Sequence, residues 1–153
     1  MFERYTERAR RTLFFSRYEA SQYGNVSILP EHVLLGLIRE SKGPIARIFA
    51  AAGLPLEDVR AYVERIRAAE SIPVSVEIPF AESTKHLLLH AAEEADALSH
   101  SSIAAPHLLL GLLRLDSEPL VAYLTEHGVT LASTREHVAK DWIDEESMAP
   151  GER

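Results

Sequence analysis

An internal duplication is the feature of this sequence that most constrains its fold. When the sequence is shifted by 75 positions, residues 5–54 align with residues 80–129 without a gap. The phrase HVLLGLIR at 32–39 returns as HLLLGLLR at 107–114. Identical residues also occur outside this phrase, among them Glu19 and Glu94, Ser27 and Ser102, Pro44 and Pro119, and Gly53 and Gly128. A constant offset over a whole unit indicates that the same set of secondary-structure elements occurs twice in the chain.

Each copy contains the start and stop signals of four helices. In the first copy Thr6 is a good N-cap, Gly24 follows a helix end, and Pro30, Pro44 and Pro55 suit first turns. These signals predict helices over 7–23, 30–40, 44–52 and 55–66. In the second copy we expect helices over about 82–98, 105–114, 118–127 and 131–143, the last capped by Thr130. The resulting organisation is repeat one at 2–67, an extended linker at 68–79, repeat two at 80–144 and a flexible tail at 145–153.

Two residue types inside the repeated phrase raise structural questions. Gly36 and Gly111 fall in mid-helix, where glycine costs roughly 1 kcal/mol relative to alanine. A close helix crossing at these positions would explain them. His32 and His107 fall in the first turn of the same helices. We expect both to be neutral core histidines that are held by hydrogen bonds.

Composition narrows the function classes. The chain has 153 residues, 46% of them hydrophobic, which suits one compact domain or two closely packed halves. There is no cysteine, so disulfides and thiolate metal sites are excluded. The net charge of −7 disfavours nucleic acid as a partner, and no apolar run is long enough to span a membrane. Nothing at the N-terminus has the pattern of a signal peptide, so a cytoplasmic location is expected.

The segments FERYTERARRTLFFSRYEAS and ILPEHVLLGLIRE, with IAAPHLLLGLLR in the second copy, resemble the N-terminal domain of the Clp/Hsp100 unfoldases, the ClpC type in particular. The resemblance covers about residues 2–142 and implies an all-α fold of two four-helix Clp N-domain units related by a pseudo-twofold axis. It also implies a non-catalytic module without a cofactor, which recognises protein substrates or adaptors and belongs with a Clp ATPase or protease complex.

The ATPase part of that family has no counterpart in this sequence. The phosphate-loop pattern G-x-x-x-x-G-K-[ST] does not occur, so we expect no enzyme activity of the family's kind. Two interpretations stay open. The chain is either the N-terminal domain of a longer unfoldase or a free-standing regulator that docks onto, or competes with, a Clp unfoldase.

The resemblance to ClpC also implies a reader of arginine-phosphorylated substrates, with one pocket in each repeat. Thr6, Arg8 and Glu31 stand at the family's pocket positions in repeat one, although Pro30 replaces the family's usual threonine. The carboxylate would bind the guanidinium group, while the cation and hydroxyl would bind the phosphate. The equivalent positions in repeat two are Ala81, Ser83 and Pro106, so we expect at most one working pocket.

The first helix carries two further signals. It is rich in aromatic residues, so a partner-binding apolar surface of Phe2, Tyr5, Phe14 and Phe15 competes with burial of these rings against repeat two. It is also rich in arginine, which suits either a solvated face or a surface for a phosphate or an acidic partner; these residues are Arg4, Arg8, Arg10, Arg11 and Arg17.

A function of another class rests on histidine. His86 and His90 would face one side of a helix, with Glu93 or Glu94 one turn further on. Zinc requires three or four ligands, and the remaining ligands are not evident from the sequence. A small helical metal-binding protein or enzyme is therefore the alternative, and we assign no metal site.

Overall fold

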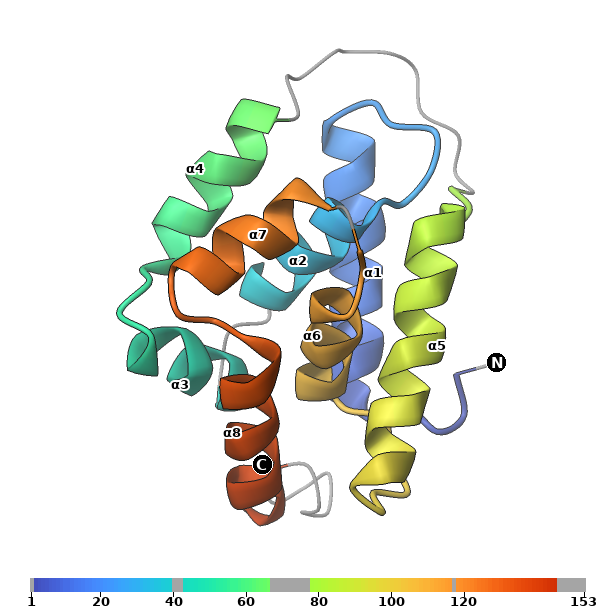
Figure 1. The fold of residues 1–153 in the computed structure, drawn as a ribbon. Coiled ribbons are helices and arrows are strands. Elements are labelled where there is room, and N and C mark those ends of the chain that lie inside the picture. The colour runs from blue at the N-terminus through green and yellow to red at the C-terminus, as the bar shows by residue number, and fades with distance from the viewer. Residues whose placement is uncertain (1, 40–42, 67–77, 117, 146–153) are drawn as a thin grey trace.

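The molecule is built from helices alone in the part that its computed structural model describes, which comprises residues 2–39, 43–66, 78–116 and 118–145 (Figure 1). Repeat one contains α1 (Glu7–Gln22), α2 (Pro30–Arg39), α3 (Pro44–Ala51) and α4 (Leu56–Ile66). Repeat two contains α5 (Glu82–Ala97), α6 (Ala105–Leu113), α7 (Pro119–Glu126) and α8 (Leu131–Glu145). The predicted all-α tandem repeat is confirmed.

The helices begin where the sequence signals place them. The Thr6 hydroxyl accepts a hydrogen bond from the Ala9 N–H at 3.1 Å, and the Thr130 hydroxyl accepts one from the Ser133 N–H at 3.0 Å. The described boundaries agree to within one residue except at the last helix, where α8 continues to Glu145, beyond the predicted end at about 143. Most of the predicted linker (68–77) and of the predicted tail (146–153) lies outside the described residues.

The two repeats exchange equivalent contacts. The Ile28 N–H donates to the carbonyl of Pro79 at 2.8 Å, and the Ile103 N–H donates to the carbonyl of Arg4 at 2.9 Å. These two bonds are related by the same 75-residue offset as the sequence. Each repeat thus holds, before its second helix, the extended segment that precedes the first helix of the other repeat. Reciprocal contacts of this kind are those of a pseudo-twofold arrangement.

The repeated phrase forms the centre of the molecule. Every residue from Pro30 to Ile38 and from Ala105 to Leu113 is buried, and Figure 1 shows α2 and α6 in the middle of the fold. A Cβ atom added to Gly36 would lie 2.4 Å from the Thr12 carbonyl oxygen. One added to Gly111 would lie 2.3 Å from the Leu87 carbonyl oxygen. The predicted close crossings are confirmed, since α2 packs directly on the backbone of α1 and α6 on that of α5.

Both repeated histidines are core residues, as predicted. The Nδ1 atoms of His32 and His107 accept from backbone N–H groups three residues earlier, at 2.9 and 2.8 Å. A neutral ring then carries its proton on Nε2, which donates to Asn25 Oδ1 at 3.1 Å in repeat one and to His100 Nδ1 at 3.0 Å in repeat two. The His100 ring stacks on Trp142 with centroids 3.7 Å apart. Burial lowers the pKa of His107 to about 3.

Candidate protein-binding site

An apolar groove of about 690 Å³ runs along α1 where repeat one meets the start of repeat two. We call it the α1 groove. Leu13 and Phe14 line it from α1, and the arginines one turn away on either side, Arg10 and Arg17, also line it. The lining is completed by Phe2, Ile28, Ile78, Pro79 and Phe80. Residues from both repeats are therefore needed to form this groove.

A second groove, of about 460 Å³, occupies the equivalent place along α5. We call it the α5 groove. Its helix positions are Lys85, Leu88, Leu89 and Ala92, which correspond to Arg10, Leu13, Phe14 and Arg17 through the 75-residue offset. Its lining also includes Glu3 and Arg4, whereas none of the described residues that line the α1 groove is acidic. Each groove has two cationic side chains among its described lining residues, but the α1 groove has three aromatic rings against two and lacks the acidic Glu3 of the α5 groove.

The aromatic residues of the predicted surface divide into exposed and buried rings. Phe14 is 65% exposed at the edge of the α1 groove. Phe2 is half-buried and packs edge-to-face on Tyr5 and Phe80, at 5.0 and 6.2 Å between centroids. Tyr5 is only 7% exposed, so burial against repeat two, the competing prediction, holds for this ring, which also lines the α5 groove. Its ring is covered because the segment before α1 pairs with Ile103 of repeat two.

The predicted phosphoarginine residues lie at two helix starts in repeat one. Thr6 is the N-cap of α1, Arg8 is in its first turn, and Glu31 is in the first turn of α2. Thr6 and Glu31 are 7% and 3% exposed. Glu31 lies near Tyr62 of α4. Burial is the main cause that raises the pKa of Tyr62, and the negative charge of Glu31 is the second.

The equivalent positions in repeat two have another environment. Ala81 is the N-cap of α5 and provides no side-chain cap. Pro106 is buried and borders, with Ile48 and Trp142, a small space between α3, α6 and α8. Apolar packing therefore occupies the position that holds a carboxylate in repeat one.

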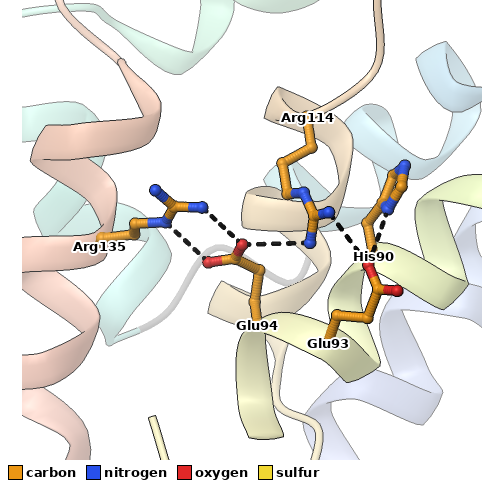
Figure 2. A network of polar contacts seen from close by, with 5 residues as sticks. All are labelled: His90, Glu93, Glu94, Arg114 and Arg135. Carbon is orange, nitrogen blue, oxygen red and sulfur yellow. Dashed lines mark hydrogen bonds and ion pairs between the residues drawn. The ribbon is translucent and has the colours of Figure 1, made fainter. Parts of the chain in front are cut away.

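A buried glutamate in each repeat binds two arginines, a feature that the sequence analysis missed. In repeat two, Glu94 accepts from Arg135 at 2.9 and 2.8 Å and from Arg114 at 3.3 Å, as Figure 2 shows. Hydrogen bonds from Arg135 hold the pKa of Glu94 below its usual value. In repeat one, Glu19 binds Arg39 and Arg60 in the same way, at 3.1–3.2 Å. The identity of Glu19 with Glu94 and of Arg39 with Arg114 was the available signal.

The metal-binding alternative gains no support from the geometry. His90 Nδ1 is 3.1 Å from Glu93 Oε1, which makes an ordinary one-turn pair. Over residues 2–39, 43–66, 78–116 and 118–145, no three histidine, aspartate or glutamate side chains are grouped so that they could hold a metal ion. Within these same ranges no helix has the length and apolar character needed to cross a bilayer.

Comparison with known proteins decides the family. A family model for the Clp repeat (R) N-terminal domain matches residues 4–127. The chain belongs to this family. It is 38% identical over 152 residues to the chloroplastic ClpA homolog CD4B of Solanum lycopersicum, an ATP-binding subunit of the ATP-dependent Clp protease. It is 42% identical over 127 residues to the chloroplastic chaperone protein ClpC2 of Arabidopsis thaliana.

The Clp N-terminal domain is a small part of these relatives. The two alignments cover 99% and 83% of this chain but only 16% and 13% of the relatives. Both relatives are chloroplast proteins by name, so the cytoplasmic location expected from the sequence stays a prediction.

Solved Clp N-domains share the fold. The N-terminal domain of ClpD from Arabidopsis thaliana superposes with a TM-score of 0.72 at 28% identity, covering 92% of this chain and 95% of that one. The ClpV N-domain in complex with a VipB peptide superposes with a TM-score of 0.74 at 17% identity, covering 94% and 87%.

Proposed function

We propose that this Clp N-terminal domain is a non-catalytic protein-recognition module that binds substrate proteins or adaptors. The α1 groove carries the proposal. It is mainly apolar, it has an exposed phenylalanine at its edge, and two arginines line it. Grooves of this kind suit apolar side chains of an extended or helical segment. The peptide complex of the ClpV N-domain, a protein of the same fold, supports this assignment by analogy.

An unfolded protein is the simplest probe for this function. Binding of fluorescently labelled casein can be followed by fluorescence anisotropy in the native chain and in Phe14→Ser. Because Phe14 is 65% exposed, its replacement should leave the fold intact. We expect affinity to fall at least about fivefold, as for an aromatic anchor residue.

Leu89→Ser is the matched control, because Leu89 is the equivalent position in the α5 groove and is 55% exposed. We expect less than about a twofold effect from this change. The proposal fails if native protein does not bind casein, or if both substitutions act equally.

We further propose that Thr6, Arg8 and Glu31 form a pocket for arginine-phosphorylated substrates in repeat one only. The chemical complementarity of a carboxylate with a cation and a hydroxyl supports it, as does the apolar replacement at Pro106. Isothermal titration with free phosphoarginine tests it. Binding that is lost in Glu31→Ala supports the pocket, whereas no heat at millimolar ligand, or binding unchanged in this variant, refutes it.

The larger assembly is also a matter of proposal. We infer the division into repeat one (2–67), linker (68–79), repeat two (80–144) and tail (145–153), and a cytoplasmic setting beside a Clp ATPase or protease. The alternative role is a free-standing regulator of a Clp unfoldase. A pull-down from native lysate separates the two roles: recovery of an unfoldase ring supports the regulator, and recovery of substrates or adaptors supports the recognition module.

A further inference from the structure

The two Glu–Arg–Arg networks differ in one partner. In repeat two, Arg114 contacts the carboxylates of both Glu94, at 3.3 Å, and Glu93, at 3.0 Å (Figure 2). In repeat one, the position of Glu93 is occupied by Tyr18 and that of His90 by Phe15.

Arg39, the equivalent of Arg114 in repeat one, therefore stacks on two aromatic rings where Arg114 contacts a second carboxylate. The guanidinium carbon of Arg39 lies 4.7 Å from the ring centroid of Tyr18 and 5.5 Å from that of Phe15. In the part of the chain that the structure describes, Arg39 has one carboxylate partner, Glu19, at 3.2 Å. Arg39 is 44% exposed in its side chain, so its outer N–H groups face solvent beside two aromatic rings.

The two networks differ in the carboxylates that lie beside their arginines. Repeat two places Arg114 and Arg135 against Glu93 and Glu94, which sums to zero. Repeat one places Arg39 and Arg60 against Glu19, and the charge of Glu64 also acts on Arg60, so the carboxylate that is missing is the one beside Arg39. The first network therefore has capacity for one more carboxylate, in the place where the second network already contains one.

Exposed aromatic surface surrounds this arginine. Tyr18 is 42% exposed and Phe14 65% exposed, and Phe14 packs edge-to-face on Phe15 with centroids 5.8 Å apart. We call Phe14, Phe15, Tyr18 and Arg39 the Arg39 patch. It adjoins the α1 groove, because Phe14 belongs to both.

We propose that the Arg39 patch binds an acidic segment of a partner protein. A carboxylate of the partner would bind Arg39 as Glu93 binds Arg114, and a neighbouring apolar side chain would pack on Phe14 and Tyr18. The inference rests on the proposed recognition function and defines its partner class. It also gives repeat one a charge preference that repeat two cannot share, because Glu93 already occupies the equivalent position.

Two other occupants fit the charges less well. A symmetric contact between two copies of this chain through the Arg39 patch would bring like charges together. Single-stranded nucleic acid also uses arginine and aromatic stacking, but the net charge of −7 opposes it, and the group that occupies this position in repeat two is a carboxylate. An acidic protein segment therefore fits best.

Tyr18→Glu tests the proposal by supplying the carboxylate from within the chain. Repeat two folds with glutamate at this position, so the variant should unfold thermally like native protein. The probe is a dye-labelled amphipathic peptide with glutamates flanking leucine and tryptophan, followed by anisotropy at low and at high salt. A second peptide has each glutamate replaced by glutamine. Glu93→Tyr is the reciprocal variant, which should create a second site in repeat two.

The inference is supported if Tyr18→Glu lowers the affinity for the acidic peptide by about tenfold or more, as expected for the loss of one charge-assisted contact. Native protein should bind the glutamine peptide with an affinity that is lower by a similar factor than its affinity for the acidic peptide. Glu93→Tyr should raise the number of acidic peptides bound per chain from one to two. Equal binding of both peptides, native affinity in Tyr18→Glu, or preferential binding of an oligothymidylate overturns it. If casein binding depends on Phe14 while Tyr18→Glu binds the acidic peptide normally, the recognition function stands and the Arg39 patch is refuted.

Discussion

Single residues in the repeated phrase are fixed by contacts with backbone. Gly36 is the clearest example, because its missing Cβ leaves room for the Thr12 carbonyl oxygen and for the Ser16 hydroxyl. A carbonyl inside a helix cannot move away as a flexible side chain can. The glycine is therefore retained in spite of its low helix propensity.

We expect Gly36→Ala to destabilise the chain by about 3 kcal/mol, since overpacking outweighs the gain of roughly 1 kcal/mol in helix propensity. The added methyl group would lie 2.4 Å from the Thr12 oxygen, so α1 and α2 would have to separate. Urea unfolding measures the change. Gly111→Ala should behave alike, and stability equal to native in either variant would contradict the crossing geometry.

The hydrogen-bonded pair of the half-buried His100 and the buried His107 in repeat two predicts acid sensitivity. Burial lowers the pKa of His107 from 6.5 to about 3 and also lowers the pKa of His100. The unfolded chain therefore binds protons below about pH 6.5 that the native chain does not bind. Stability should be complete above that pH and should fall as the pH decreases toward about 3. His107 alone should account for about 3 kcal/mol at pH 4.

Trp142 is the single tryptophan of the chain and stacks on His100, so its fluorescence reports this site in urea titrations at several pH values. His100→Asn copies the Asn25–His32 pair of repeat one and should reduce the acid sensitivity without loss of stability at neutral pH. Stability that stays constant down to about pH 5 would argue against this account.

At the scale of helices, the Glu–Arg–Arg networks join three elements of each repeat. Glu94 comes from α5, Arg114 from the end of α6 and Arg135 from α8. Glu19, Arg39 and Arg60 join α1, α2 and α4 equivalently. A buried carboxylate with two guanidinium partners fixes the relative positions of these helices more than it adds net stability.

Glu94→Gln should destabilise the chain by about 1–3 kcal/mol, because two guanidinium groups lose their shared carboxylate. The value is below that of a fully buried pair, since the Arg135 side chain is 48% exposed. Thermal unfolding provides the measurement, with Glu93→Gln as control. Glu93 is 49% exposed in its side chain, so its replacement should leave the melting temperature close to the native value. Equal effects at the two positions would contradict a structural role for Glu94.

At the scale of the whole molecule, local signals in the sequence predict the elements but not their partners. Thr6, Thr130 and the prolines identify helix starts because capping depends on a few adjacent residues. Burial against repeat two was one of the two predictions for Tyr5, but its partner could not be named, since the pairing is with Ile103, 98 residues away. Periodicity shows that a side chain faces something apolar, but it does not show which element covers it.

The candidate site follows the same rule. The excess of aromatic residues on α1 indicated a binding surface, and Phe14 is exposed as that hypothesis requires. The α1 groove itself was not predictable, because Ile78 at the end of the linker and Phe80 at the start of repeat two contribute to it. The networks around Glu19 and Glu94 were missed because each joins residues 41 positions apart in the sequence.

Recognition of polypeptide segments in the α1 groove is the proposed function of this Clp N-terminal domain. The most direct test is a titration of the ¹⁵N-labelled chain with an unlabelled unfolded polypeptide, followed by NMR chemical-shift mapping. We expect saturable shifts that concentrate at Phe14, Arg17 and Phe80, with smaller changes along the α5 groove. Shifts that are absent at saturating polypeptide, or that concentrate on α8, would contradict it.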